Sequence, residues 1–176
     1  MNRFIALLRG INVGGHQKLP MAELKEVLAR LGLSNIKTYI QSGNVVFDSE
    51  EGSRSLLAAQ IQAAIDQSHG FAPSIMLLTA AEIETAIASN PFPEGAQEPK
   101  TLHLYFLSRA AEQPDFPALD QVKKESERYW LADQVFYLHA PDGIGRSKLA
   151  TKVEKALGVA VTARNWRTVN KIREML

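Results

Sequence analysis

The stretch ALLRGINVGGHQKLPM, residues 6–21, decides how the start of this chain folds. Its apolar run has the length of a strand and ends at an arginine and a glycine-rich loop. Pro20 then stands where the first turn of a helix favours proline, and apolar residues recur at helical spacing until Gly32. The stretch predicts a strand over residues 3–8, a loop shaped for close backbone approach to a ligand, and a helix.

The rest of the first half continues this pattern. Residues 36–40 and 45–47 are predicted strands, joined by a tight turn at QSGN, residues 41–44. A second helix with Leu57 and Ile61 on one face ends at Gly70, and residues 74–78 form another strand. The order β-α-β-β-α-β is the ferredoxin-like plan, in which two helices cover one face of an antiparallel sheet.

The second half is predicted to repeat this order over residues 101–163, without a residue-level repeat. We expect strands at 102–107 and 159–161, a hairpin at 128–131 and 135–139, and helices at 115–125 and before Gly158. A last helix carries Trp166, Val169 and Ile172. The predicted fold class is α+β: two tandem ferredoxin-like (βαββαβ, α/β plait) subdomains with antiparallel sheets, plus a C-terminal helix.

Three segments are expected. Residues 1–79 form the first ferredoxin-like subdomain. Residues 80–100 form a short helix, opened by the capping box TAAE at residues 79–82, and a proline-rich linker. Residues 101–176 form the second ferredoxin-like subdomain with the C-terminal helix.

Composition restricts the function classes. The 176 residues are 45% hydrophobic and 22% charged, which is ordinary for a soluble globular protein. No cysteine is present, which excludes disulfides, thiol nucleophiles and thiolate metal sites and fits a cytoplasmic location. No apolar run approaches the roughly 20 residues that span a bilayer, and no cleavable leader pattern is present, so no membrane partner is expected.

The net charge of +1 conceals a segregation of charge along the chain. Residues 1–47 carry six Lys/Arg against two Asp/Glu, and residues 146–176 carry eight against two, whereas the middle is acidic. If the two basic ends meet, they form a positive surface that attracts phosphates. The alternative is a dipolar, solvated surface.

Two predicted helix starts carry the wrong charge for a helix N-terminus. Helix N-termini favour acidic residues, yet Arg146 and Lys148 flank one start and Arg164 and Arg167 flank the other. A helix N-terminus beside glycines is a ready phosphate site. The alternative is that these long side chains point to solvent or pair with the acidic middle of the chain.

The fold plan places the loop after the first strand beside the turn at residues 41–44, where polar side chains can share a ligand. Cationic side chains would contact phosphate, glycines would let backbone N–H groups approach, and amides would bind a polar edge. Trp166 would anchor the core or stack on the ligand, and Ser147 also suits a helix cap. The predicted ligand-binding residues are Arg9, Asn12, Gly14, Gly15, His16, Gln41, Asn44, Gly143, Gly145, Arg146, Ser147, Lys148, Arg164, Asn165, Trp166 and Arg167.

Several specific chemistries have no support in the sequence. His16 and Gln17 stand where a P-loop has its lysine and hydroxyl, and GIGRSK lacks the third glycine of a dinucleotide-binding motif. The four histidines have no metal-ligand spacing. No metal, no cofactor and no catalytic residue is therefore predicted.

Five strings of this chain, IALLRGINVGGHQKLPM, TYIQSGNVVF, NPF, GIGRSKL and TARNWRTVNKI, occur in order from about residue 3 to the C-terminus. They resemble the successive blocks of the bacterial family called domain of unknown function 1697. The resemblance implies two ferredoxin-like subdomains and implies no activity.

The leading hypothesis is a cytoplasmic protein that binds a phosphate-bearing partner, a nucleotide or a nucleic acid, through basic, glycine-rich loops at helix N-termini. One alternative is an enzyme acting on a small anionic metabolite, with His16 as acid or base and Arg9 as clamp, which requires a pocket around His16. Another is a structural interaction module without a ligand. Whether a reaction is catalysed, and the oligomeric state, stay open at this point.

Overall fold

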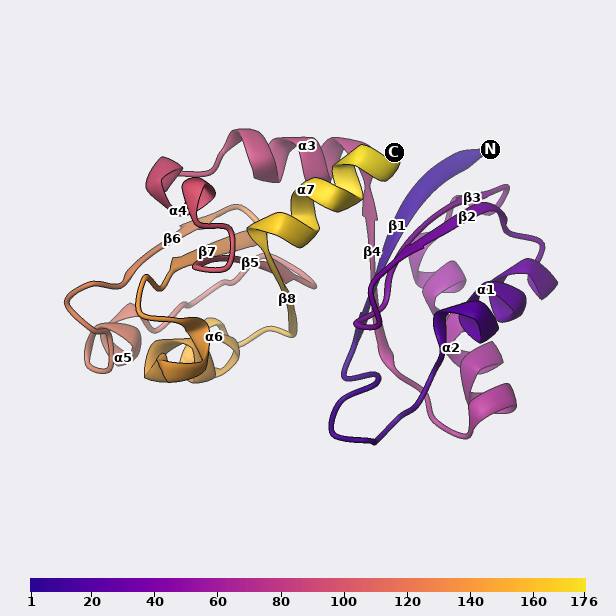
Figure 1. The fold of residues 1–176 in the computed structure, drawn as a ribbon, viewed down its shortest axis with the longest axis horizontal. Coiled ribbons are helices and arrows are strands. Elements are labelled where there is room, and N and C mark those ends of the chain that lie inside the picture. The colour runs from indigo at the N-terminus through magenta and orange to yellow at the C-terminus, as the bar shows by residue number, and fades with distance from the viewer. The chain divides into compact units, whose positions relative to one another are not determined.

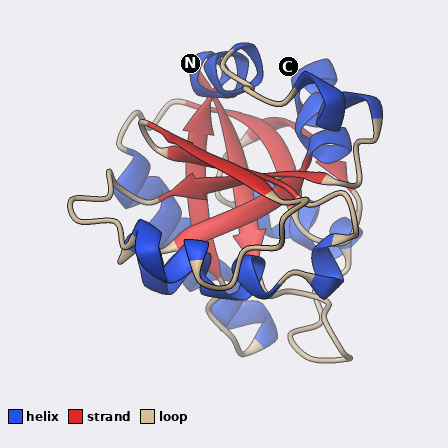
Figure 2. Ribbon diagram, turned by 90° about the vertical axis from the view of Figure 1, so that its left-hand side faces the viewer, coloured by secondary structure: helices blue, strands red, loops and turns tan.

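The computed structural model describes residues 1–176, which divide into two compact units. Unit 1 comprises Met1–Glu84 and Lys171–Leu176, and unit 2 comprises Thr85–Asn170. Each unit contains one four-stranded antiparallel sheet (Figure 1); Figure 2 distinguishes the strands from the helices by colour. The predicted α+β class, with two βαββαβ sheets and a C-terminal helix, is confirmed.

In unit 1 the strand order is β2-β3-β1-β4, the order of a ferredoxin-like sheet. Helices α1 and α2 cover one face of this sheet (Figure 1). The elements of this sheet and its two helices are β1 (Asn2–Arg9), α1 (Met21–Arg30), β2 (Ser34–Tyr39), β3 (Asn44–Ser49), α2 (Arg54–His69) and β4 (Ser74–Thr79).

The central strand β1 is buried on both faces. Phe4, Ala6 and Leu8 belong to the core beneath α1 and α2. Ile5 and Leu7 alternate to the other face and are also fully buried. An unbroken apolar run in place of strict alternation is the sequence pattern that such two-sided burial requires.

A charged cluster holds the end of the last helix, α7 (Trp166–Met175), against the sheet of unit 1. Arg3 donates from Nε and Nη2 to the two carboxylate oxygens of Asp48, at 2.7 and 2.9 Å, and its Nη1 donates to the Leu176 carbonyl. Lys37 Nζ donates to the Met175 carbonyl at 2.8 Å. The hydrogen bonds from Arg3 and from Asn35 lower the pKa of Asp48 to about 2.

In unit 2 the strand order is β6-β7-β5-β8, which repeats the first sheet. Helices α5 and α6 pack on the face that carries Tyr105, Leu107 and Phe136. On the opposite face the Tyr137 hydroxyl donates to the Ala86 carbonyl of α3, at 2.6 Å. The elements are α3 (Ala80–Ala88, which begins in unit 1), α4 (Pro93–Gln97), β5 (Leu102–Leu107), α5 (Phe116–Asp120), β6 (Arg128–Ala132), β7 (Val135–His139), the 3-10 turn η1 (Ile144–Arg146), α6 (Lys148–Leu157) and β8 (Val161–Asn165). None of the helices has both the length and the hydropathy to cross a membrane.

Three elements differ from the prediction. Helix α5 has five residues, because the Asp115 carboxylate caps it and Leu119 is its one buried residue, so there is no apolar face to extend it to residue 125. The segment expected as a linker contains α4, which proline starts at its first turn. The last strand, β8, shares only Val161 with the expected residues 159–161 and runs on to Asn165, because Val161 to Asn165 pair with β5.

Candidate functional site

The glycine loop of unit 1 forms a miniature hairpin. Val13 and His16 bridge each other, with the His16 amide donating to the Val13 carbonyl at 2.9 Å. The two residues between them, Gly14 and Gly15, have φ values of +57° and +77°. Two consecutive positive φ values are what a two-residue type I′ hairpin turn demands, so these glycines have a conformational role of their own.

Asn12 fixes this hairpin to the rest of unit 1. Its Nδ2 donates to the carbonyls of Leu19 and Gln41, at 2.9 and 2.7 Å, and its Oδ1 accepts from the Leu19 amide at 2.8 Å. The predicted juxtaposition of the glycine loop and the turn after β2 is therefore confirmed. The side-chain amide of Asn12 holds the loop and the turn together. Both donors of its Nδ2 and one acceptor site of its Oδ1 are already used by the chain.

Replacing Asn12 by alanine should therefore loosen the loop. The change leaves the Leu19 amide and two carbonyls without their side-chain partner, and we expect unfolding to become easier by about 1–2 kcal/mol. Gln17→Ala is the matched control, because Gln17 is exposed, has φ +49° and makes no side-chain hydrogen bond. Hydrogen exchange of the Leu19 amide should accelerate in N12A and stay unchanged in Q17A; equal effects would contradict this bracing role.

The turn after β2 comes very close to β1. The Gly43 carbonyl accepts from the Leu8 amide at 2.9 Å, and Asn44 is fully buried, with Nδ2 donating to the Tyr39 carbonyl and to Ser42 Oγ. Asn44 was predicted to bind a ligand's polar edge, but the structure uses it inside the turn. Gln41 stays exposed at the surface of this turn.

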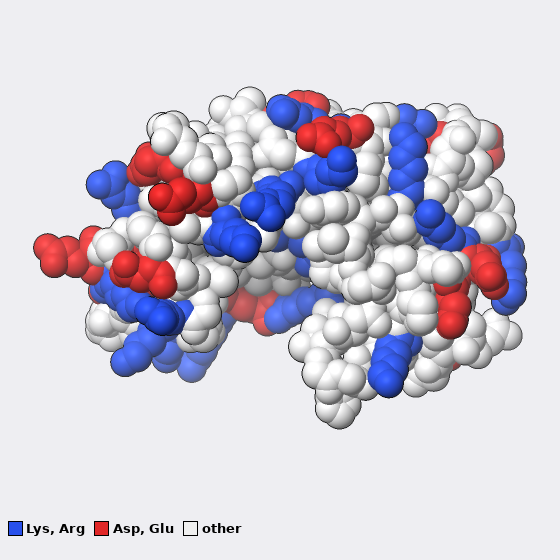
Figure 3. All heavy atoms as spheres, viewed as in Figure 1, with Lys and Arg blue, Asp and Glu red and all other residues white.

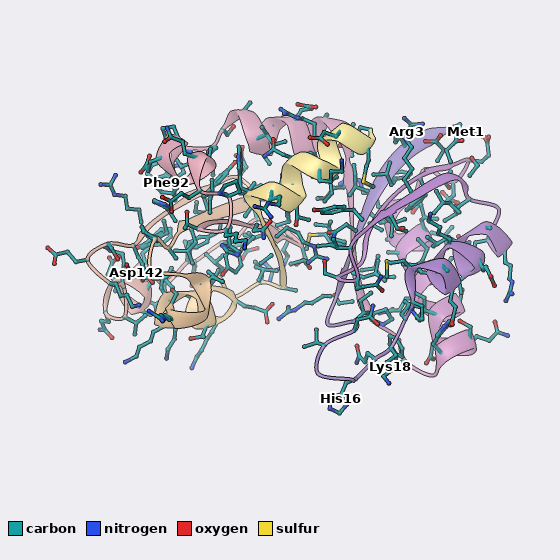
Figure 4. The ribbon with its side chains drawn as sticks, viewed as in Figure 1. Met1, Arg3, His16, Lys18, Phe92 and Asp142 are labelled. Atoms are coloured by element: carbon teal, nitrogen blue, oxygen red, sulfur yellow. The ribbon has the colours of Figure 1, made fainter.

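His16 lies at the tip of the hairpin and points away from the fold (Figure 4). Its side chain is exposed and makes no hydrogen bond or ion pair. The enzyme hypothesis requires a pocket that closes His16 against Arg9 and Gln41. The exposed position of His16 argues against this hypothesis. Arg9, also exposed, ends β1 opposite Ser74.

The basic loop of unit 2 leads directly into α6. Gly143 has φ +101°, η1 follows, and Ser147 then caps α6, with its Oγ accepting from the Ala150 amide at 3.0 Å. Ser147 is buried, which agrees with its reading as a cap. Arg146 and Lys148, on either side of Ser147, are both exposed and form no ion pair. Gly145 has open space where a Cβ would stand.

The start of α7 is built differently from the start of α6. Arg164 lies within β8, opposite Leu104, and burial lowers its pKa to about 10. Asn165 caps α7 by accepting from the Thr168 amide at 2.9 Å, so its amide oxygen is used internally. Trp166 is half-buried and belongs to neither core cluster. Arg167 is exposed in the first turn, which has no acidic residue.

The sheet register relates the two basic loops of unit 2. Leu102 pairs with His139 and His103 pairs with Asn165, so β7 and β8 end at the same end of the sheet, with β5 between them. No hydrogen bond joins the loop before α6 to the first turn of α7. The predicted residues therefore occupy three places, the hairpin and turn of unit 1, the start of α6, and the start of α7.

The exposed face of α6 carries two further cations that the sequence prediction did not include. Lys152 and Lys155 follow Lys148 at intervals of four and three residues, are exposed and form no ion pair. That spacing places all three on one side of a helix, and Figure 3 shows Lys and Arg atoms gathered over α6. The helical spacing of the lysines is the signal in the sequence that indicates them.

Comparison with known proteins places the chain in a family. The model of the family described as protein of unknown function (DUF1697) matches residues 1–137. The chain belongs to this family. The matched residues include the glycine loop and the turn after β2, and they end before α6. The predicted resemblance is thereby confirmed over residues 1–137, which contain three of the five strings.

Among solved structures, the conserved bacterial protein SP0830 from Streptococcus pneumoniae is similar to this DUF1697 protein. The two share 25% sequence identity with a TM-score of 0.73, and the match covers 98% of this chain and 97% of the other. No curated protein matches this chain. The shared fold thus extends over nearly the whole length of both chains.

Proposed function

We propose that this DUF1697 protein binds a phosphate-bearing ligand, a nucleotide or a nucleic acid, at the loop that leads into α6. The observation that carries the proposal is the exposed pair Arg146 and Lys148, which brackets a helix start and has no carboxylate partner. Cations at a helix N-terminus oppose the helix dipole, and a bound anion reverses that penalty.

The backbone at the same position supports the proposal. A helix leaves its first amides without intrahelical partners, and here the Ser147 hydroxyl occupies the amide of Ala150. The amide of the exposed residue Lys148 keeps no partner in the chain and, like the two cations, suits a phosphate oxygen. Gly143 and Gly145 keep the approach to these amides free of side-chain bulk.

The other predicted places support phosphate binding less. In unit 1 the amides of Asn12 and Asn44 are occupied by their own chain, and in unit 2 the guanidinium of Arg164 is largely buried. The first turn of α1 carries Glu23, as an ordinary helix N-terminus does. The start of α6 is where cation, exposed loop and helix end coincide.

The test is a binding titration with inorganic phosphate, ATP and a short DNA duplex in turn. We expect at least one of them to bind, and the double variant R146A/K148A to lose at least about tenfold in affinity, because two charge-assisted contacts disappear. The control is K18A/K25A, which removes two exposed lysines of unit 1 that form no ion pair. Absence of binding by all three probes, or equal losses in both variants, would contradict the proposal.

A further inference from the structure

The basic face of α6 is defined by Arg146, Lys148, Lys152 and Lys155. At about 100° per residue, the three lysines lie within about 60° of one another around the helix axis. Lys155 lies about 10 Å further along the axis than Lys148, at 1.5 Å per residue. Together with Arg146, just before the helix, they form a continuous cationic stripe.

This stripe has no carboxylate partner within its own helix. In α1, Arg30 pairs with Glu26, and in α7, Lys171 pairs with Glu174. The one acidic residue of α6 is Glu154, whose carboxylate accepts from the Val161 amide at 3.0 Å. Asp142, in the loop before η1 (Figure 4), accepts from the Ser126 hydroxyl and forms no ion pair with the stripe.

The arrangement is unfavourable for the isolated helix. Lys148 and Lys152 are a like-charge pair at a separation of four residues, which weakens a helix, and Lys148 also stands at the positive end of the dipole. Only Lys155, in the last turn, has a favourable position relative to the dipole. Because the stripe costs the helix stability, a bound anion would offset an unfavourable charge arrangement.

We propose that the basic face of α6 binds the phosphodiester backbone of a nucleic acid, without reading its sequence. This inference rests on the proposed function and narrows it, because cations spread over about 10 Å along the helix suit the successive phosphates of a polynucleotide better than one phosphate group. A DNA duplex presents one charge per about 1.7 Å of its axis and can contact the whole stripe.

The side chains between the cations add no further base-recognising group to this face. Thr151, which is exposed beside them, donates its hydroxyl to the Lys148 carbonyl at 2.7 Å. No aromatic ring or side-chain amide belongs to α6, so the face offers neither stacking nor the amide contacts by which proteins discriminate bases. The apolar residues of α6 are turned into the core of unit 2, where Leu149 and Val153 are fully buried.

The experiment measures the anisotropy of a labelled mixed-sequence DNA duplex titrated with the full chain at several salt concentrations. Four phosphate contacts predict a slope of log K against log salt of about −3.6, which corresponds to roughly a 100-fold loss of affinity between about 50 and 200 mM salt. K152A/K155A should reduce the slope by about two. A duplex of different sequence should bind equally well.

Two controls separate binding from folding and from general charge effects. K18A/K25A makes the same change in net charge within unit 1 and should leave both affinity and slope unchanged. K152A/K155A should unfold at the same temperature as the unmodified protein or higher, because alanine favours helix and the like-charge pair is gone. If K152A/K155A is folded and no longer binds, the loss of affinity comes from the missing lysines and not from unfolding.

The outcomes distinguish this inference from the function on which it rests. Suppose that ATP binds through Arg146 and Lys148, while K152A/K155A changes neither the affinity for the duplex nor its salt dependence. The proposed function then stands and the nucleic-acid inference is overturned. Absence of duplex binding, or binding to phosphatidylserine vesicles in place of the duplex, also overturns it. Failure of every anionic probe would remove both.

Discussion

Replacing Gly43 by alanine should destabilise unit 1 more than any other single alanine substitution considered for this protein. Gly43 has φ +84°, and a Cβ there would lie 2.7 Å from Leu8 Cβ and 2.8 Å from Ile11 Cδ1. The left-handed backbone costs about 1–2 kcal/mol for alanine, and forcing a methyl group into packed neighbours costs about 1–3 kcal/mol. We expect a loss of about 2–5 kcal/mol in the free energy of unfolding.

Gly70→Ala separates the two contributions. Gly70 ends α2 with φ +78°, and a Cβ there would meet nothing within 4 Å, so this variant should lose only the backbone term of about 1–2 kcal/mol. Unfolding of unit 1 should be followed by far-UV circular dichroism, because both tryptophans, Trp130 and Trp166, lie in unit 2. Equal losses in G43A and G70A would show that the close approach of Gly43 to β1 and Ile11 is absent in solution.

Acidification should destabilise unit 2 before it affects the carboxylates of unit 1. Nδ1 of His103, in the central strand β5, is buried without a hydrogen-bond partner, and burial lowers the pKa of this histidine to about 4. The unfolded chain takes up a proton near pH 6.5, whereas the folded chain does so near pH 4. The stability contributed by neutral His103 is therefore present above pH 6.5 and is lost as the pH falls toward 4.

The pKa difference corresponds to at most about 3 kcal/mol of unfolding free energy. Urea unfolding followed by tryptophan fluorescence at pH 7 and near pH 4 measures it, because both tryptophans lie in unit 2. His103→Gln and His103→Phe should each remove most of this pH dependence. Asp48, whose pKa is about 2 in the folded protein, loses its contribution only at lower pH. An unchanged pH dependence in both His103 variants would contradict the burial of this imidazole.

The sequence predicted the architecture well because the order of elements follows from the hydrophobic pattern and from the glycines and turns that end each element. The unbroken run before Arg9, the glycines at positions 32, 70 and 158, and the turn at residues 41–44 determined the order of elements in each half. That order alone placed the glycine loop beside the turn, and the hydrogen bond from Asn12 to the Gln41 carbonyl confirms this placement. The sequence placed β8 too early in the chain and made it too short, because its pairing with β5 is a tertiary effect.

The roles of the polar site residues were harder to predict. An asparagine amide has the same donors and acceptors whether it binds a ligand or its own backbone, and Asn12, Asn44 and Asn165 all bind their own chain. Arg164 was expected beside a helix start, yet it is a strand residue with a largely buried guanidinium. In contrast, Arg146 and Lys148 follow directly from the sequence, because a charge of the wrong sign at a helix N-terminus is visible without coordinates.

The most direct test of phosphate binding at the start of α6 is amide chemical-shift mapping of the isotope-labelled protein during titration with inorganic phosphate and then ATP. We predict saturable shifts centred on the amides of residues 143–148, with the largest change at Lys148, and their disappearance in R146A/K148A. Shifts centred on residues 13–17 or 41–43 would contradict this placement of the site. So would a spectrum that does not change on addition of either ligand up to millimolar concentration.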